Sequence, residues 1–454
     1  MSIAVSISHL QGKERKEIIA TVQQQAKKAA LEAIHPILTE FLEAEVEIKL
    51  GRKKGVNRQI SSQKREIEWK CGYCGCQDAN QFMRDGHYKR SLETGWGHIQ
   101  GLRVPMLECQ HCHHDVICQF SILEKYSRFW LDLDQDVLFS SGLGQSLRVI
   151  SERWSVQVGG NVGLRTINER LNQIEPLIEY MRASAFPTAP SVVQLDGIWV
   201  TIQSQQEKIK QDKRKRRRKQ RTGKKIVILV ALGFWEDGRR EILDWQIAPS
   251  EEHTHWEVLL NRLWAREVQP EKGLQMIVRD GSGGLGEAVA LVYGTSVLDQ
   301  RCIFHKLKNV ADKARSELKG EEKREERKQL IKQAKTIYQA ESAAQAKDQL
   351  HLWSEQWRET APKAVATLEK DFEDTLVYYA LESVTREWIR TTSLLERTNR
   401  ELRRKFRQAV TFGSQIGAEV AVYLQVQRLH ARWTKASWWQ VSHDLIFVRE
   451  NTNP

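Results

Sequence analysis

One acidic residue interrupts a strand-like run between Ser191 and Gln203, and this feature constrains the fold of the chain more than any other. The run, SVVQLDGIWVTIQ, is rich in β-branched and apolar residues, which is typical of a buried strand. Asp196 lies in its middle, and a buried carboxylate is costly unless it is paired, hydrogen-bonded or bound to a cation. Asp196 is therefore either part of a metal site or a strand residue turned to solvent.

Further strands and helices alternate after this stretch. The second strand-like run is KIVILVALGF at residues 225–234, and the third is REILDWQIAPS at residues 240–250. After a helical segment at residues 251–268, a buried strand at residues 274–278 leads to Asp280, and closely spaced glycines then open a helix. A short strand and another helix follow. The order β-β-β-α-β-α-β-α predicts an α/β fold with a ribonuclease-H-like mixed sheet.

This topology predicts where acidic side chains meet. Asp196 lies within the first strand and Asp280 at the end of a later strand, and we expect these two strands to be neighbours. A third acid should come from a helix against that edge, and Glu396 is the candidate because an arginine stripe follows it on one helical face. Carboxylates suit Mg²⁺, and two such ions about 3.5–4 Å apart serve phosphodiester hydrolysis or transfer. The stripe consists of Arg400, Arg403 and Arg407.

Each of these acids also has a purely structural interpretation. Asp196 could face solvent, and Asp280 could occupy a turn or cap the helix that the glycines open. Glu396 completes the pattern Ser393-x-x-Glu396, a capping box that would hold it at a helix start for local reasons. The three acids together, in this order and on these elements, favour the metal site.

Six of the seven cysteines lie between Cys71 and Cys118. Two CxxC pairs with residues 75–108 between them fit a tetrahedral zinc ribbon, in which each pair supplies two thiolates. Such a site is structural, because four thiolates leave no open coordination position. The alternative is cysteines without metal, and Cys76, His111, His113 and His114 are further candidate ligands. We predict that zinc is held by Cys71, Cys74, Cys109 and Cys112, with a β-hairpin or meander between the pairs.

Two short helical segments with a glycine-containing turn between them follow the cysteine region. This pattern favours a helix-turn-helix, whose second helix would lie in the major groove of DNA. Arg165 and Asn168 lie on the outer face of that second helix and are the candidate DNA contacts. Helical hairpins that bind no DNA are the alternative.

The net charge of +12 is concentrated in one place. Residues 207–225 contain 12 Lys or Arg against two acids, and they lie between the first and second strands. We expect an exposed hairpin insertion that binds phosphates by counterion release, although a solvated tip would have the same composition. The DNA contacts predicted there are Arg214, Arg216, Arg217 and Arg218.

Long helical regions lie at both sides of these segments. Residues 13–50 form one helix that packs on the protein or joins two copies of it. Trp353 and Trp357, four residues apart, belong to a helical core or stack on a distorted base.

No apolar run reaches the ~20 residues that span a bilayer, and no signal-peptide core is visible near the start. We therefore expect a cytoplasmic, nucleoid-associated protein with no membrane contact.

The pattern predicts six regions. Residues 1–65 are a helical region with a basic linker, 66–122 a zinc-ribbon-like domain, and 123–186 a helix-turn-helix region. Residues 187–318 and 391–435 form the ribonuclease-H-like domain, 319–390 an all-helical insertion, and 436–454 a C-terminal tail.

Five stretches together resemble the Mutator-type insertion-sequence transposases: DGIWV, GFWEDGRREIL, IVRDGSGGL, RCIFHKLKNV and TTSLLERTNRELRRKFR. The resemblance covers residues 192–433 and implies a DDE catalytic domain of ribonuclease-H fold. Position by position, Asp196, Asp280 and Glu396 match its DDE triad. Cys302 and His305 match its C-x₂-H signature, for which the residues alone leave open a small metal site, a DNA contact or helix packing.

The resemblance implies a DNA transposase that binds the terminal inverted repeats of an insertion sequence. Two Mg²⁺ (or Mn²⁺) per active site would serve strand cleavage and strand transfer, with double-stranded DNA of element ends and target as partner and a homodimer or higher oligomer as the acting form. The cysteine ribbon and the basic insertion depart from the family pattern and indicate a divergent branch. The alternatives are a nuclease of the same fold that does not join DNA, and a domesticated, non-catalytic DNA-binding regulator.

Overall fold

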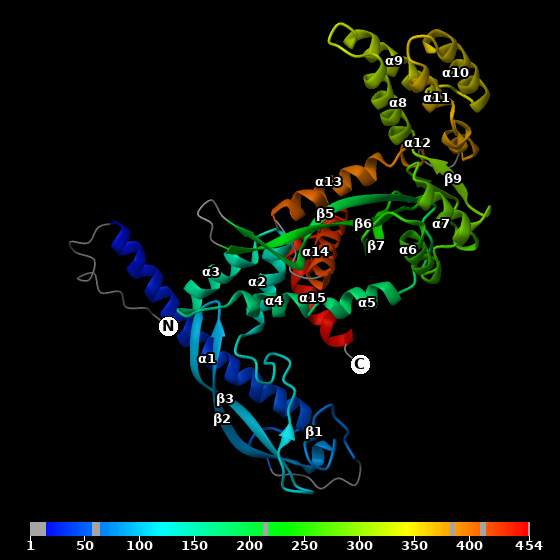
Figure 1. The fold of residues 1–454 in the computed structure, drawn as a ribbon. Helices are drawn as coiled ribbons and strands as arrows, with labels where there is room; N and C mark the ends of the chain where they lie inside the picture. Colours follow the sequence, from blue (N-terminus) through cyan, green and yellow to red (C-terminus); the bar gives the residue numbers. More distant parts are fainter. Residues whose placement is uncertain (1–14, 57–63, 212–216, 382–385, 409–414, 453–454) are drawn as a thin grey trace. The chain divides into compact units, whose positions relative to one another are not determined.

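The computed structural model describes most of the chain, and Figure 1 shows its elements. The described residues are 15–56, 64–211, 217–381, 386–408 and 415–452. Within them, the side chains of residues 202–211, 217–223, 386–387, 404–408 and 449–452 are outside the description. Two compact units divide the chain: Met1–Ser140 with Gln145–Leu171, and Ser141–Gly144 with Asn172–Pro454.

The first unit is built on a long helix and a long hairpin. Helix α1 (Arg15–Leu50) packs against the antiparallel pair β2 (Phe82–Thr94) and β3 (Gly97–Cys109). Its buried side chains recur at three or four residues, as one face of a helix requires. They lie among the buried residues of the hairpin, so the predicted helix and the predicted hairpin are both confirmed. The buried residues of α1 are Leu38, Leu42, Val46 and Leu50.

Three helices follow in this part of the chain: α2 (Leu131–Gly142), α3 (Leu147–Val158) and α4 (Leu164–Asn172). Helix α3 ends at Gly159, whose φ of 69° is readily adopted only by glycine. The turn is held by Val162, which is buried and whose backbone N–H donates to Ser155 Oγ at 2.9 Å. The expected pair of short helices with a glycine turn is therefore present. Helical hairpins share this arrangement, so its assignment as a helix-turn-helix stays a prediction.

A five-stranded mixed sheet forms the centre of the second unit. Its order is β7-β6-β5-β8-β9, in which β5, β6 and β7 are antiparallel neighbours and β8 and β9 run parallel to β5. The order of elements along the chain is the predicted one. The strands are β5 (Val192–Gln211), β6 (Arg217–Phe234), β7 (Arg240–Ala248), β8 (Met276–Arg279) and β9 (Leu298–Arg301).

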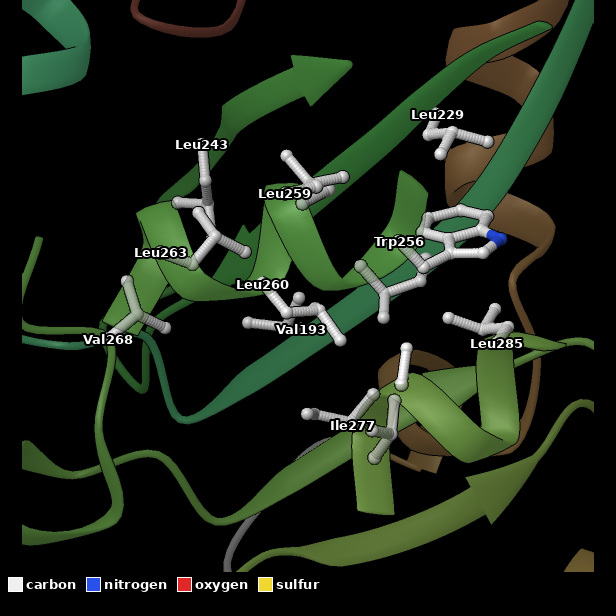
Figure 2. Close-up of a cluster of buried hydrophobic side chains, with 14 of the residues drawn as sticks. Val193, Leu229, Leu243, Trp256, Leu259, Leu260, Leu263, Val268, Ile277 and Leu285 are labelled. Atoms are coloured by element: carbon white, nitrogen blue, oxygen red, sulfur yellow. The ribbon is translucent and has the colours of Figure 1, made fainter. Parts of the chain in front are cut away.

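Helices α6 (His253–Ala265) and α7 (Gly283–Tyr293) cover one face of this sheet. Figure 2 shows Val193 and Leu229 of the strands beside Trp256 and Leu260 of α6. Val193 and Leu195 belong to this core, and since strand side chains alternate, Gln194 and Asp196 lie on the opposite face. The buried face of β5 therefore fixes the direction of Asp196.

The opposite face is covered by helices from the C-terminal part of the chain. They are α13 (Ser393–Gln408) and α14 (Gln415–Trp433), which pack on β5 and β7 respectively, and α15 (Trp438–Thr452), which packs on α14 and on α5 (Glu175–Ala183). Residues 436–454, expected to be a tail, thus consist mainly of a helix. Its Leu445 and Ile446 are buried, and their apolar side chains explain why the segment packs.

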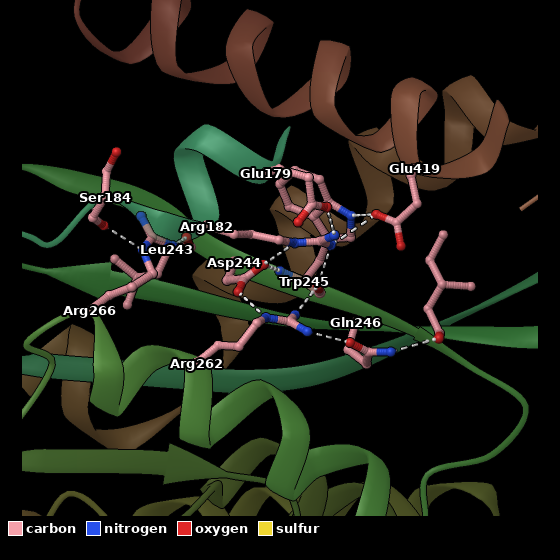
Figure 3. A network of polar contacts seen from close by, with 11 residues as sticks. Glu179, Arg182, Ser184, Leu243, Asp244, Trp245, Gln246, Arg262, Arg266 and Glu419 are labelled. Carbon is pink, nitrogen blue, oxygen red and sulfur yellow. Dashed lines mark hydrogen bonds and ion pairs between the residues drawn. The ribbon is translucent and has the colours of Figure 1, made fainter. Parts of the chain in front are cut away.

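A buried carboxylate joins three of these elements (Figure 3). Asp244 of β7 is fully buried and accepts hydrogen bonds from Arg182 of α5 at 3.4 Å and from Arg262 of α6 at 2.8 Å. Arg182 also donates to Glu419 of α14 at 3.0 Å. Because a buried charge is tolerated only when it is paired, this network holds α5, α6 and α14 around β7.

A group of helices follows β9. It contains α8 (Ile303–Glu317), α9 (Arg324–Ile337), α10 (Ala343–Trp357), α11 (Pro362–Glu369), the short 3₁₀ segments η4 (Glu373–Thr375) and η5 (Val377–Ala380), and α12 (Arg386–Arg390). Trp353 and Trp357 are buried, and their indole N–H groups donate to Leu330 O and Gln333 Oε1. The pair belongs to the helical core. Across the described ranges, every helix is too short or too polar to cross a membrane.

Candidate functional site

Asp196 and Asp280 are brought to the same edge by the pairing of β5 with β8. The parallel ladder joins Val192 to Met276 and Gln194 to Val278. The ladder ends there, two residues before Asp196 and Asp280, and Asp280 acts electrostatically on Asp196. The pairing of β5 with β8 therefore brings the two carboxylates into the same region.

The surroundings of Asp196 are mostly protein. Burial raises the pKa of Asp196, the nearby Asp280 raises it further, and His305 and Asn399 oppose this rise. The Asn399 side-chain amide donates to Asp196 Oδ2 at 2.7 Å. Asp196 is therefore a half-buried carboxylate that is bonded to Asn399 and lies within the field of a second carboxylate.

The helix that carries Glu396 is held to β5 by Gln194, two residues before Asp196. Gln194 is fully buried, and its Oε1 accepts from the backbone N–H of Leu395 at 3.2 Å. Its Nε2 donates to the backbone oxygens of Trp388 and Thr391. One glutamine thus places the start of α13 against the strand, and Glu396 with it.

Glu396 faces a histidine and the strand. Its Oε1 lies 3.4 Å from His305 Nε2, and burial together with Asp196 raises its pKa, while His305 lowers it. Helix α13 begins at Ser393 and the N–H of Glu396 donates to Thr392 O, so Thr392 stands at the cap position. Since Ser393 is already helical, the capping-box interpretation does not account for Glu396.

Asp280 follows β8 directly and lies in the loop before α7. Its Oδ1 accepts from the backbone N–H of Ser282 at 2.9 Å, a local turn contact. Ser282, not Asp280, is the cap residue of α7. The turn leaves the second carboxylate oxygen of Asp280 for other interactions.

Cys302 and His305 connect the start of α8 to the start of α13. Cys302 is fully buried, and its sulfur accepts from the Thr392 N–H at 3.2 Å. Burial lowers the pKa of His305, but Cys302, Asp196 and Glu396 outweigh this and raise its pKa to about 9. Of the three interpretations of this signature, these contacts agree with packing at the start of a helix, beside the carboxylates.

A fourth carboxylate, Glu251, lies in the same region and is absent from the predicted set. Burial raises the pKa of Glu251, Asp280 and Asp196 raise it further, and a hydrogen bond from Trp199 lowers it. Residues 251–268 look like one helix in the sequence, but α6 begins at His253, so Glu251 belongs to the loop after β7. No spacing pattern in the sequence identifies Glu251, because its position depends on a contact with the distant Gly197.

These side chains fit a divalent cation. No ion pair joins Asp196, Asp280 or Glu251 to a lysine or arginine among the described side chains. Glu396 Oε1 and Asn399 Oδ1 are buried, and neither has a hydrogen-bond partner within the described part of the chain. Clustered, partly unsatisfied oxygen ligands of this kind are those that Mg²⁺ binds. The oxygens of Asp196, Asp280 and Glu396 are not all within 4.8 Å of one another, and a two-ion site, which spreads its ligands over both ions, does not require that.

A second candidate metal centre is present in the first unit. The sulfurs of Cys71, Cys74, Cys109 and Cys112 all lie within 4.8 Å of one another. The strand pair β1 (Lys70–Cys71) and β4 (Val116–Ile117) and the end of β3 bring the two CxxC pairs together. The donor set and its compactness fit tetrahedral zinc.

The two CxxC pairs have the same backbone form. The residue after each second cysteine, Gly75 or His113, has a positive φ of 69° or 58°. Its backbone N–H donates to the oxygen of the first cysteine of its pair, Cys71 or Cys109. Two similar turns face each other, as expected for a ribbon. Cys76 and His114 stay outside the four-sulfur group, and His113 contacts Glu108 instead.

The structure describes the side chains of some candidate DNA contacts, only the backbone of others, and neither for the rest. Arg165 on α4 is exposed and bonds Glu169 at 2.7 Å, and Asn168 is half-buried. Arg400 and Arg403 on α13 are exposed, and the backbone but not the side chain of Arg407 is described. Strands β5 and β6 remain paired as far as Gln211 and Arg217, so the basic segment extends the hairpin as predicted. Arg214 and Arg216 lie outside the described residues, as do the side chains of Arg217 and Arg218.

Comparisons with known proteins identify the family to which the chain is similar. The family model described as transposase, Mutator family, matches residues 23–436. The transposase for insertion sequence element IS905 of Lactococcus lactis is 26% identical over 357 residues, which cover 76% of this chain and 82% of that protein. The transposase for element ISRM5 of Rhizobium meliloti is 25% identical over 414 residues, with 90% and 89% covered.

Among solved structures, the Drosophila P element transposase strand transfer complex aligns with 66% of this chain and 80% of that chain. The sequence identity is 9% and the TM-score is 0.26, which is too low to support a conclusion about the fold.

Proposed function

Because the chain belongs to the Mutator family of transposases, we propose that it is a DDE-type DNA transposase that cuts the ends of an insertion sequence and joins them to target DNA. The observation that carries the proposal is the grouping of Asp196, Asp280 and Glu396 around the β5–β8 edge. The strand order β7-β6-β5-β8-β9, with β7, β6 and β5 antiparallel and β8 and β9 parallel, supports a ribonuclease-H-like domain.

The three carboxylates would hold two Mg²⁺ or Mn²⁺. Bound there, the ions would supply a nucleophilic oxygen and stabilise the leaving oxygen of a phosphodiester. The chain's own contribution is to hold the acids in place: Gln194 fixes the start of α13, and Asn399 orients Asp196. His305, beside Glu396, offsets part of the negative charge of the cluster when no cation is bound.

Basic groups near the acids would hold DNA. Arg400 and Arg403 are exposed on the helix that carries Glu396, four and seven residues after it, so they share its side of the helix. Phosphates bound by this stripe would lie close to the carboxylates. The basic extension of the β5–β6 hairpin would hold flanking or target DNA through its charge.

Recognition of the element ends would reside in the first unit. Helices α3 and α4 support a helix-turn-helix, with Arg165 and Asn168 on its second helix, and the four cysteines support a zinc ribbon beside it. Bringing two ends together requires at least two copies, so the acting form would be a homodimer or a larger oligomer.

A direct test incubates the purified protein and Mg²⁺ with labelled DNA from the flanks of its own gene. We expect nicks at the element ends, followed by joined products, and loss of both in Asp280→Asn and Glu396→Gln. Arg165→Ala should weaken binding to the ends while Mg²⁺-dependent nicking of other DNA persists.

The same assay separates the alternatives. Nicks without joined product in the wild type would replace the transposase by a nuclease of the same fold. End binding without any cleavage, unchanged in Asp280→Asn, would indicate a non-catalytic regulator.

A further inference from the structure

Glu251 is the carboxylate in the second unit that the three-acid site leaves without a role. It is half-buried and lies two residues before the start of α6. Its side chain contacts Gly197, and its backbone contacts Gly284. Two glycines, one close in sequence to each aspartate, contact Glu251 or its loop and show where Glu251 lies.

The first of these glycines is Gly197, next to Asp196 on β5. A Cβ atom built on Gly197 would lie 2.5 Å from Glu251 Oε1. The Glu251 carboxylate therefore occupies the space in which any other residue at position 197 would place its side chain. Since neighbouring strand residues point to opposite faces, the Glu251 carboxylate lies on the α6 face of β5, across the strand from the Asp196 side chain.

The second glycine is Gly284, four residues after Asp280. A Cβ built there would lie 3.1 Å from the backbone oxygen of Glu251 and 2.9 Å from the N–H nitrogen of His253. The loop that carries Glu251 thus packs directly on the start of α7, beside the Asp280 turn. The two glycines thus permit a close approach of Glu251 to β5 beside Asp196 and to the start of α7 after Asp280.

The electrostatic surroundings agree with this placement. Asp280 is the strongest charged neighbour of Glu251, and Asp196 is a further one. His305 is the cation that acts on it, and within the described side chains no lysine or arginine pairs with it. Glu251, Asp280 and Asp196 act on one another electrostatically with one histidine near them, and like charges grouped in this way are unfavourable unless a cation joins them.

The buried oxygen of Asn399 is an independent observation that points to a cation at this place. The Asn399 side chain is 2% exposed and reaches into the cluster, where its Nδ2 donates to Asp196. Its Oδ1 has no hydrogen-bond partner within the described residues. A buried amide oxygen without a partner beside several carboxylates is a position that a hydrated cation satisfies.

We propose that Glu251 is a fourth carboxylate of the metal site and holds one of the two divalent cations together with Asp280. This inference rests on the function proposed above. Glu396 reaches the site from the face covered by α13, whereas Glu251 reaches it from the face covered by α6 and α7. The two faces of the sheet would thus each contribute one glutamate, and the strand ends would contribute the two aspartates.

The purely structural alternative is that Glu251 only accepts the hydrogen bond of the Trp199 indole. Glu251→Gln separates the two roles, because glutamine keeps the acceptor oxygen and the volume but removes the charge. Glu252→Gln is the matched control, since Glu252 is the exposed neighbour at the cap of α6 and its side chain makes no capping hydrogen bond.

The test measures binding of Mn²⁺ alone to the full chain by electron paramagnetic resonance. We expect two bound Mn²⁺ in the wild type and in Glu252→Gln. In Glu251→Gln one of the two Mn²⁺ ions should bind at least about tenfold more weakly. Loss of a residue that only hydrogen-bonds to a metal ligand already weakens metal binding by about that factor. Cleavage by Glu251→Gln should recover at a correspondingly higher Mn²⁺ concentration.

A second variant gives the same information without changing any charge. Gly197→Ala forces the Glu251 carboxylate away, because the atom that the new methyl group meets is the far end of a flexible side chain. It should weaken Mn²⁺ binding in the same direction. Thermal melting of each variant without metal checks that the fold is kept.

The outcomes distinguish the two proposals. If Glu251→Gln and Gly197→Ala bind Mn²⁺ like the wild type while Asp280→Asn does not, the role of Glu251 is overturned and the three-acid site stands. If Asp280→Asn also binds Mn²⁺ like the wild type, the proposed site itself fails.

Discussion

Asn399 shows how a neutral side chain orients a charged one. It is buried on α13, one turn after Glu396, and donates to Asp196 Oδ2 at 2.7 Å. We predict that Asn399→Ala lowers the rate of end cleavage about 10- to 100-fold, which corresponds to the roughly 1.5–3 kcal/mol of a hydrogen bond to a charged group. Single-turnover cleavage of a labelled end checks this. Thr398→Ala, one residue away, is the control, and an equal loss there would show that the effect is general to the helix.

His430 of α14 is a half-buried histidine whose neutral form accepts a backbone hydrogen bond. Its Nε2 accepts from the backbone N–H of Ile242 on β7 at 2.9 Å, and burial lowers its pKa to about 4. In the unfolded chain the pKa is about 6.5. The folded state therefore binds the proton more weakly, so its contribution to stability is complete above about pH 6.5 and is lost as the pH falls toward 4.

The corresponding prediction compares the wild type with His430→Gln, which keeps an acceptor at this position but has no proton to gain. Between pH 7.5 and pH 5 the wild type should lose about 2 kcal/mol more unfolding free energy than the variant, because this range covers only part of the interval between the folded and unfolded pKa values. Urea unfolding at several pH values measures this. Parallel loss in both proteins would mean that His430 is not the group that titrates.

Some site residues could be predicted from the sequence and others could not. Asp196 and Asp280 are visible because each breaks or ends an apolar strand, and such patterns depend only on neighbours in the chain. Asn399 and Glu251 gain their positions from contacts with residues distant in sequence, Asp196 in one case and Gly197 in the other. Periodicity carries no signal for contacts of that kind, so neither residue could be predicted.

At the scale of elements, the strands were the most predictable part of the chain. The order of β5 to β9 with their helices followed from short apolar runs, because both faces of these strands are buried. The C-terminal helix α15 was missed, since its residues show no clear apolar face and its burial depends on contacts with α14 and α5. Element boundaries also moved, as at α6, where the true start leaves Glu251 in a loop.

Helix α1 carries two apolar faces, of which the hairpin β2–β3 covers only one. The second apolar face is a stripe of exposed residues, and each of its side chains is between 47% and 71% exposed. These residues recur at helical spacing opposite the buried Leu42 and Val46. A solvent-exposed apolar stripe of this length is typical of a helix that pairs with another helix. The stripe consists of Ile19, Val22, Ile37, Phe41 and Ile48.

We therefore predict that Phe41→Glu, at the centre of the longer part of this stripe, converts a dimer into a monomer. Sedimentation velocity of the full chain measures this, and the melting temperature should change little because Phe41 is 61% exposed. Glu40→Gln, on the neighbouring exposed position, is the control. An unchanged sedimentation coefficient in Phe41→Glu would place the contact between copies elsewhere.

At the scale of the whole molecule, the two compact units carry different chemistry. The four-cysteine group and the α3–α4 pair belong to the first, and all the acids of the proposed active site belong to the second. A chain divided in this way can lose recognition of its DNA ends without losing hydrolysis. Removal of zinc from the first unit tests whether the division is functional.

We predict that Cys74→Ser with Cys112→Ser abolishes bound zinc and specific binding to element ends, while Mg²⁺-dependent nicking of unrelated DNA continues. Structural zinc contributes on the order of 10 kcal/mol to the folding of a small ribbon, so its loss should disorder the region around Trp69 and Cys109. Elemental analysis for zinc and binding to labelled ends measure the two effects.

The controls for this experiment are the cysteines next to the four-sulfur group. Cys76 and Cys118 both lie outside the four-sulfur group. Cys76→Ser and Cys118→Ser should therefore retain one zinc per chain and bind element ends like the wild type. Zinc retained by the double variant, or lost equally in these controls, would contradict the assignment of Cys71, Cys74, Cys109 and Cys112. Loss of all nicking together with zinc would show instead that the ribbon is needed for the active site itself.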